Sequence, residues 1–305
     1  MKILVTGATG LLGRAVMRRF ADEPDFNVVG LCHARKGDGL KPVDLTDAAA
    51  VQAVLDAERP DAIVHTAAIR RPDAFAADEA AARRLNVAAT ETLARWTAAH
   101  SGTFLVYIST DYVFDGTQPP YFPESRPHPV NGYGQSKLDG EIAVRETAGA
   151  QTAILRVPIL YGDEVETLAE SSVTTVMAQV LKLARPGNET YSKSFPLVLD
   201  DWSVRYPTHV SDVADILAQI VARRLVGTFQ WSGREALTKL DMGLVVAKEL
   251  GLATALLKGS GEPAAGGEPR PKDCHLDCGA LEALGVTTPG IPYAVAVRRL
   301  LARFA

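Results

Sequence analysis

Two hydrophobic periods alternate along the first half of the chain. Short, mostly apolar runs with many β-branched residues are typical of buried strands, and they occur at 2–7, 27–32, 61–67, 103–110 and 152–157. Helical spacing of apolar residues predicts helices over 11–21, 46–59, 79–100 and 133–148. The second of these helices has Thr46 as its expected N-cap and ends before Pro60. Strands that alternate with helices predict right-handed βαβ units and a parallel, doubly wound α/β sheet of the Rossmann type.

The second half of the chain is less regular. Residues 163–203 mix helical pattern with polar loop, 208–225 have the pattern of an amphipathic helix, and 227–233 that of a strand. The Gly/Pro-rich stretch 259–271 is expected to be either a flexible linker or a lid.

These patterns predict two domains. An NADP-binding Rossmann domain is expected over 1–160, with later contributions from about 204–230. A smaller C-terminal α/β domain, mainly for substrate, is expected over 161–305. The cleft between the two domains is the expected site.

A glycine pattern lies between the first strand and the first helix. Gly7, Gly10 and Gly13 are spaced so that a tight turn can bring backbone N–H groups and a helix N-terminus against a pyrophosphate. The position at a strand-to-helix junction is the context that such a motif requires. We therefore assign dinucleotide binding to the turn and its flanks, namely Gly7, Thr9, Gly10, Leu11, Leu12 and Gly13.

Cations follow the second predicted strand. NAD sites usually have Asp or Glu about 20 residues after the glycines, where it accepts a hydrogen bond from the ribose 2′-hydroxyl, but no acid lies between residues 27 and 37. His33, Arg35 and Lys36 follow the strand, and Arg14 lies in the first turn of the preceding helix. Cations here suit a 2′-phosphate, so NADP(H) is the predicted cofactor. The alternative is a solvated basic loop.

Tyr133 and Lys137 are the main candidates for chemistry. They stand at i and i+4 of a predicted helix and so share one face. The strand before that helix delivers Ser109, Thr110 and Asp111 to the carboxyl edge of the sheet, where ligands bind in open α/β folds. A lysine ammonium and oxidised nicotinamide both favour a phenolate. Tyr133 is then able to give a proton to a carbonyl as hydride arrives, with Thr110 holding the same oxygen.

Composition and charge exclude several classes of protein. The 305 residues have a net charge of −4, which gives no electrostatic case for nucleic acid or an anionic membrane as a partner. Three cysteines are too few, and odd in number, for a disulfide framework. Cys274 and Cys278 lie near His275, but the further ligands that a zinc site requires are missing, so no metal is predicted. No signal peptide or membrane-spanning run is visible, which predicts a cytoplasmic protein.

Three motifs carry a resemblance to a known family. "STDYVFDG" (109–116), "YGQSKLDGE" (133–141) and "RPKD…LD" (270–277) resemble the dTDP-4-dehydrorhamnose reductase family of extended short-chain dehydrogenase/reductases (SDRs). The resemblance implies catalytic positions for Thr110, Tyr133 and Lys137, the last two also contacting the cofactor, and the structural asparagine position for Asn86. It further implies cofactor contacts near the adenine, pyrophosphate and nicotinamide for Asp44, Leu45, Ala67, Ala68 and Pro158.

Within that family, the chain more closely resembles the regulatory β subunits of methionine adenosyltransferase. The stretches that carry this likeness are "AAIRRPD" (67–73), "LRVPILYGDEVETLAESSVTTVM" (155–177), "RYPTHVSDVA" (205–214) and "GTFQWSG" (227–233). The two arginines after the double alanine stand where rhamnose-pathway reductases typically have an acidic stretch.

Five residues are assigned to substrate binding, namely Arg70, Asp111, Val113, Arg205 and Arg270. Arg70 and its neighbour Arg71 either hold a substrate phosphate or are solvated loop cations.

The leading hypothesis is an NADPH-dependent reductase of a nucleotide-linked 4-keto-6-deoxy sugar, acting as a monomer or homodimer. One alternative is an NADP-binding regulatory subunit with a methionine adenosyltransferase as its partner. A weaker alternative is a nucleotide-sugar epimerase or dehydratase.

Overall fold

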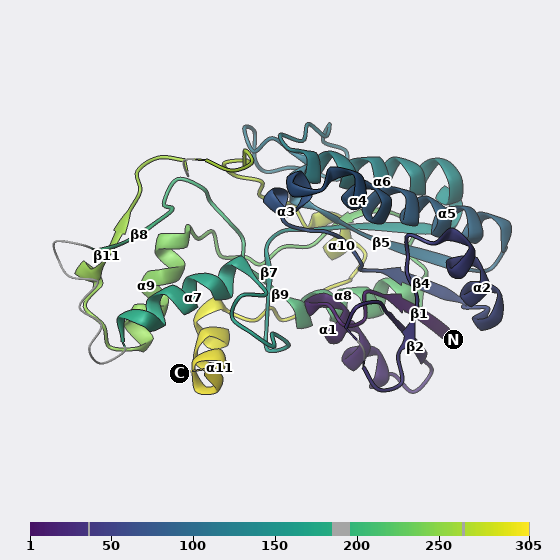
Figure 1. The fold of residues 1–305 in the computed structure, drawn as a ribbon, viewed down its shortest axis with the longest axis horizontal. Helices are drawn as coiled ribbons and strands as arrows, with labels where there is room; N and C mark the ends of the chain where they lie inside the picture. The colour runs from purple at the N-terminus through teal and green to yellow at the C-terminus, as the bar shows by residue number, and fades with distance from the viewer. Residues whose placement is uncertain (36, 185–195, 264–265, 305) are drawn as a thin grey trace.

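A seven-stranded parallel sheet forms the centre of the protein (Figure 1). The structure, a computed structural model, describes residues 1–35, 37–184, 196–263 and 266–304. The sheet order is β10-β6-β5-β4-β1-β2-β3. The strands are β1 (Lys2–Thr6), β2 (Asn27–Cys32), β3 (Lys41–Pro42), β4 (Ala62–His65), β5 (Phe104–Thr110), β6 (Thr152–Val157) and β10 (Gly227–Gln230). The order reverses between β1 and β4, which confirms the predicted doubly wound fold.

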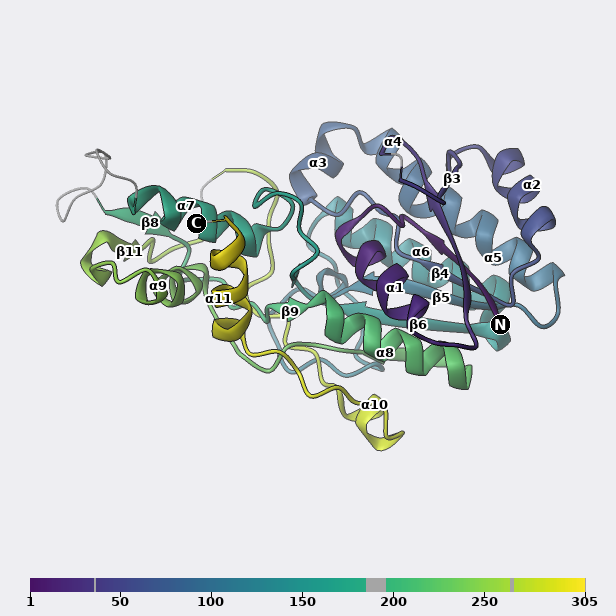
Figure 2. The same ribbon diagram turned by 90° about the horizontal axis from the view of Figure 1, so that it is seen from below.

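Helices cover both faces of the sheet (Figure 2). The larger ones are α1 (Leu11–Ala21), α2 (Ala48–Glu58), α5 (Ala89–Ala99), α6 (Gly132–Ala148) and α8 (Val210–Arg223). Because neighbouring strand residues face opposite sides, Ile3 and Val5 pack in the core cluster with α1 and α8, whereas Leu4 packs with α2, α5 and α6. In the part of the chain that the structure describes, no helix combines the length and the apolar character that crossing a bilayer requires.

Two predicted helices differ in detail from the structure. The helix expected over 79–100 is divided into α4 (Glu79–Arg83), a π-helical turn (Arg84–Ala88) and α5. The N-cap expected at Thr46 is wrong, because the Asp47 carboxylate accepts hydrogen bonds from the N–H groups of Ala49 and Ala50. Thr46 instead donates its hydroxyl to Asp44 (2.7 Å), so its oxygen serves the turn before the helix.

A second group of elements lies beside the sheet and forms the second lobe. It consists of α7 (Ser172–Leu183), β8 (Leu197–Leu199), α9 (Lys239–Glu249), β11 (Leu257–Gly259) and α11 (Tyr293–Phe304). The shorter elements are α3 (Pro72–Ala77), β7 (Leu160–Tyr161), β9 (Thr208–His209) and α10 (Gly279–Ala283). Between α7 and α9 the chain returns to the sheet, where α8 packs on α1 and β10 pairs with β6. The expected division at residue 160 stays a prediction.

Candidate functional site

A cleft of about 620 Å³ opens at the carboxyl edge of the sheet, between the sheet and the start of α7. Parallel strands place the side chains that follow them at this edge, which is why distant segments meet there. The lining includes most of the residues predicted from the sequence, namely Gly7, Thr9, Gly10, Leu11, Leu12, Gly13, Arg35, Ala67, Ala68, Arg70, Thr110, Asp111, Tyr133, Lys137, Pro158, Arg205 and Arg270.

The glycine turn is built for close approach of a ligand. Gly7 has a φ of +67°, a conformation that favours glycine, and its carbonyl accepts a hydrogen bond from the Gly10 N–H (2.8 Å). A Cβ atom on Gly13 would lie only 2.1 Å from the Gly7 carbonyl oxygen. The N-cap of α1 is Gly10, and no side chain caps this helix end. The first N–H groups of α1 are therefore free to meet a phosphate.

Tyr133 and Lys137 lie buried on one face of α6, whose start is capped by the side chain of Asn131. Burial raises the pKa of Tyr133 well above its usual value, although the Thr110 hydroxyl opposes this shift. Burial lowers the pKa of Lys137 to about 7, with the charge of Glu141 acting against the change. In this state the Tyr133 hydroxyl is protonated and is a proton donor rather than a phenolate.

The Lys137 ammonium has an aromatic neighbour rather than an anionic hydrogen-bond partner. Its Nζ atom lies 4.0 Å from the centroid of the Tyr107 ring. It makes no hydrogen bond to another group among the described residues. A lysine ammonium has three N–H donors. These donors can form hydrogen bonds with the hydroxyl groups of a ligand.

Asp111 and Arg205 both line the cleft. Burial raises the pKa of Asp111 to about 7, while the charge of Arg205 and a hydrogen bond from Thr110 (3.1 Å) act to lower it. Arg205 is itself buried and donates to the backbone carbonyls of Val204 (2.7 Å) and Lys272 (3.1 Å). Asp111 is thus a carboxyl group that is partly protonated near neutral pH and can donate as well as accept a hydrogen bond.

Asn86 has a positioning role and does not line the cleft. Its side-chain oxygen accepts from the Ile69 N–H (2.8 Å), and its Nδ2 group donates to the Ile69 carbonyl (2.9 Å) and to Ser136 Oγ (3.1 Å). Ser136 directly precedes Lys137 on α6. The π-helical turn therefore holds the loop after β4 against the helix that carries the tyrosine and lysine.

Several residues assigned from the sequence lie away from the cleft lining. His33 and Asp44 are solvent-exposed and 3.9 Å apart, and Leu45 belongs to the core on the α2 side of the sheet. Val113 is fully buried in a small apolar cluster with Phe114. Val113 is therefore not placed to contact a substrate through its side chain.

One further predicted cofactor residue, Lys36, lies outside the described residues.

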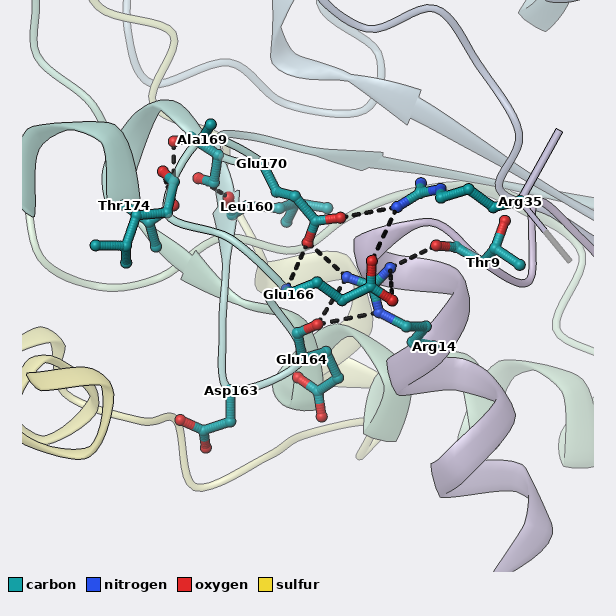
Figure 3. Close-up of polar contacts among 12 residues, drawn as sticks. Thr9, Arg14, Arg35, Leu160, Asp163, Glu164, Glu166, Ala169, Glu170 and Thr174 are labelled. Carbon is teal, nitrogen blue, oxygen red and sulfur yellow. Dashed lines mark hydrogen bonds and ion pairs between the residues drawn. The ribbon is translucent and has the colours of Figure 1, made fainter. Parts of the chain in front are cut away.

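The arginines predicted to meet a 2′-phosphate are already paired (Figure 3). Arg35 Nη1 lies 2.9 Å from Glu170 Oε1 and 3.4 Å from Glu166 Oε2. Arg14 Nη2 lies 2.6 Å from Glu170 Oε2 and also donates to the Glu164 carbonyl (2.7 Å). Sequence reasoning missed these glutamates, because the only local signal was an acidic stretch within an irregular segment.

The parallel sheet, the glycine turn and the buried tyrosine–lysine pair define an extended SDR. The chain belongs to the RmlD substrate binding domain family, whose sequence model matches residues 1–305. This match confirms the resemblance that the motifs indicated.

The chain is similar to two kinds of named protein within this family. Methionine adenosyltransferase 2 subunit beta from Rattus norvegicus is 43% identical over 290 residues, covering 93% of this chain and 83% of that protein. The subunit beta from Xenopus tropicalis is 42% identical over 306 residues, covering 98% of this chain and 87% of that protein. A solved structure of dTDP-4-dehydrorhamnose reductase from Bacillus anthracis, in complex with NADP, has a TM-score of 0.80 at 23% identity, covering 99% of this chain and 98% of that one. At that identity the likeness shows the fold alone.

Proposed function

We propose that this chain is the β-type, NADP(H)-binding subunit of a methionine adenosyltransferase. The observation that carries the proposal is the 43% identity to such subunits across 93% of the chain. The set of Thr110, Tyr133 and Lys137 favoured a reductase, and this likeness outweighs it because it extends through both lobes. Members of one fold family differ in function through the residues of their sites.

The cleft supports the nucleotide part of the proposal. The turn at Gly7 and Gly13 and the uncapped start of α1 suit a pyrophosphate. Residues 27–37 contain no acid of the kind that selects NAD, and Arg35 lines the cleft. Lys137 would hold the nicotinamide ribose through its spare donors.

The arginines after β4 make contacts within the protein. Arg70 donates to the Glu170 carbonyl, and Arg71 donates to the Ala169 carbonyl. Both guanidinium groups are thus used to hold a neighbouring loop. Both also line the cleft and have further N–H donors, so these contacts do not decide between the two candidate functions.

Complex formation tests the proposal directly. We expect the purified chain to form a stable complex with the methionine adenosyltransferase catalytic subunit of the same organism, with a Kd of about 1 μM or tighter. Analytical ultracentrifugation of the two proteins, alone and mixed, measures this. Two independent species at micromolar concentrations would overturn the subunit assignment, whatever the outcome of nucleotide binding.

A keto-sugar reductase is the second candidate, and the geometry of Thr110, Tyr133 and Lys137 favours it. Bound NADPH would supply the hydride for such a reaction. Tyr133 would donate its proton to the carbonyl oxygen as negative charge builds there, and Thr110 would hold that oxygen. Lys137 would stabilise the phenolate that remains.

Tyr133→Phe is the variant that tests this second candidate. If the wild type oxidises NADPH with dTDP-4-keto-6-deoxy-L-mannose or another keto sugar, we expect the variant to lose about 10²–10⁴-fold in turnover while keeping its NADPH affinity. Tyr293→Phe is the matched control, because the Tyr293 hydroxyl is buried in the second lobe and makes no hydrogen bond among the described residues. A wild type that turns over no keto sugar removes the reductase assignment.

A further inference from the structure

An acidic strap, residues 163–170, joins β7 to α7, and its last residue, Glu170, lines the cleft (Figure 3). Its carboxylates belong to Asp163, Glu164, Glu166 and Glu170. The strap comes from the second half of the chain, yet its partners Arg14 and Arg35 belong to α1 and to the segment after β2. Within the strap, the Glu170 carboxylate contacts both of these arginines.

The Glu170 carboxylate occupies a complete anion site. Its Oε1 accepts from Arg35 Nη1 (2.9 Å), and its Oε2 accepts from Arg14 Nη2 (2.6 Å) and from the Glu166 N–H (3.0 Å). The side chain is only 14% exposed. Two guanidinium groups and a backbone N–H are the donors that proteins commonly use to bind a phosphate.

The strap is also linked to the glycine turn through Arg14, and to the loop after β4 through two further arginines. Arg14 donates to the carbonyl of Thr9, inside the turn, as well as to that of Glu164 (3.0 Å from Nε). Arg70 and Arg71 hold the strap through its carbonyls at 169 and 170. A single arginine side chain, Arg14, therefore joins the strap to the turn on which a dinucleotide would rest.

We propose that the strap is an internal ligand of the 2′-phosphate subsite, and that NADP(H) displaces it through the 2′-phosphate whereas NAD(H) does not. The inference rests on the proposed function, in that the cleft binds NADP(H). A phosphate monoester carries a charge of about −1.5 to −2 at pH 7, against −1 for a carboxylate. It is therefore the stronger ligand for Arg14 and Arg35 once it arrives.

Displacement would reach the second lobe. The strap leads directly into α7, and the first residues of that helix, Ser172 and Thr175, line the cleft. The α7 N-cap, Ser171, donates its hydroxyl to the carbonyl of Leu160 in β7 (2.6 Å). A strap that leaves Arg14 and Arg35 thus pulls on the start of α7, which couples the phosphorylation state of the bound dinucleotide to the second lobe.

Neutral, isosteric variants test the proposal. We expect Glu170→Gln to raise the affinity for NADPH by about 10-fold, because the bound state no longer competes with an internal anion, and to change the affinity for NADH by less than about 2-fold. Glu166→Gln should act in the same direction with a smaller effect, and its exposed side chain makes misfolding of the variant no obstacle. Glu91→Gln is the control, because Glu91 also pairs with an arginine, Arg95, but on an exposed helix face. Isothermal titration calorimetry of the wild type and the three variants measures their affinities for NADPH and for NADH.

Amide hydrogen exchange distinguishes displacement of the strap by NADPH from simple repulsion between the strap carboxylates and the 2′-phosphate. In the wild type, the strap amides should exchange faster with NADPH bound than with NADH bound, because the acceptor of the Glu166 N–H is the Glu170 carboxylate. Slower exchange with NADPH would mean that the strap closes over the nucleotide, and it would overturn the proposal. An unchanged ratio of NADPH to NADH affinity in Glu170→Gln would overturn it as well, while leaving NADP(H) binding intact. If neither the wild type nor Glu170→Gln binds NADPH, the nucleotide part of the proposed function fails together with it.

Discussion

Replacing Arg156 with methionine is expected to lower the free energy of unfolding by about 3 kcal/mol. Arg156 on β6 and Glu141 on α6 form a bidentate ion pair at 2.9 and 2.8 Å, and both side chains are almost completely buried. Methionine fills similar space but leaves a buried carboxylate without its main partner. The loss lies at the low end of the range for such pairs, because Ser109 (2.5 Å) and Arg145 (3.0 Å) still contact Glu141.

The pH dependence identifies the cause of this loss. In the wild type, burial acts to raise the pKa of Glu141, but the hydrogen bond and charge of Arg156 outweigh it and hold the pKa below the usual range. This carboxylate therefore stabilises the fold above its unfolded pKa of about 4.3, and the contribution is lost as pH falls through the folded value. In the variant, burial without Arg156 raises the pKa of Glu141, so the folded protein takes up a proton as the pH falls. The difference between the two proteins should shrink between pH 7 and pH 4.

Urea denaturation of both proteins across this pH range measures the effect. Arg145→Met is the control, because Arg145 contacts the same carboxylate from a partly exposed position, and its loss should cost less than about 1 kcal/mol. Equal losses from the two substitutions, or a difference that does not vary with pH, would show that the buried pair is not the source of the stability.

Gly13→Ala is expected to reduce NADPH affinity by at least about 100-fold, which corresponds to 2.7 kcal/mol. The new Cβ would lie 2.1 Å from the Gly7 carbonyl oxygen and 2.8 Å from its carbonyl carbon. Both are backbone atoms, so relief requires the turn to open or α1 to move. Either change removes the close approach that a pyrophosphate needs.

Gly149→Ala is the matched control for this substitution. A Cβ at Gly149 meets no atom within 4 Å, and its φ of −48° suits alanine. Calorimetry with NADPH, together with circular dichroism to confirm the fold, should give wild-type affinity for this variant. A Gly13→Ala protein that is folded and binds NADPH like the wild type would place the dinucleotide elsewhere.

Most of the sheet and its helices could be predicted, because each buried strand is one contiguous apolar run. The helix expected over 79–100 shows where this approach ends. Hydrophobic spacing predicts a helical segment, but it does not reveal the π-helical turn at 84–88 that aims Asn86 at the Ile69 backbone. That turn depends on contacts with α6, which are distant in the sequence.

In the candidate site, too, some features could be predicted from the sequence and others could not. Thr110, Tyr133 and Lys137 were predictable, because the ends of parallel strands and the helices that follow them meet at one edge. The pairing of Arg14 with Glu170 was not, since 156 positions separate the two residues. Cations near a glycine turn suggested a free phosphate site, and only the three-dimensional structure reveals that an acid already occupies it.

The return of the chain to the sheet, through α8 and β10, has a consequence for how such proteins diversify. A hybrid made at one crossover near residue 160, with the second half taken from a relative, would give β6 a foreign neighbour in place of β10 and α1 a foreign neighbour in place of α8. Both contacts are buried and close-packed, so they tolerate exchange poorly. Recombination that transfers the second lobe intact must therefore cut on both sides of α8 and β10 and leave them with their own sheet.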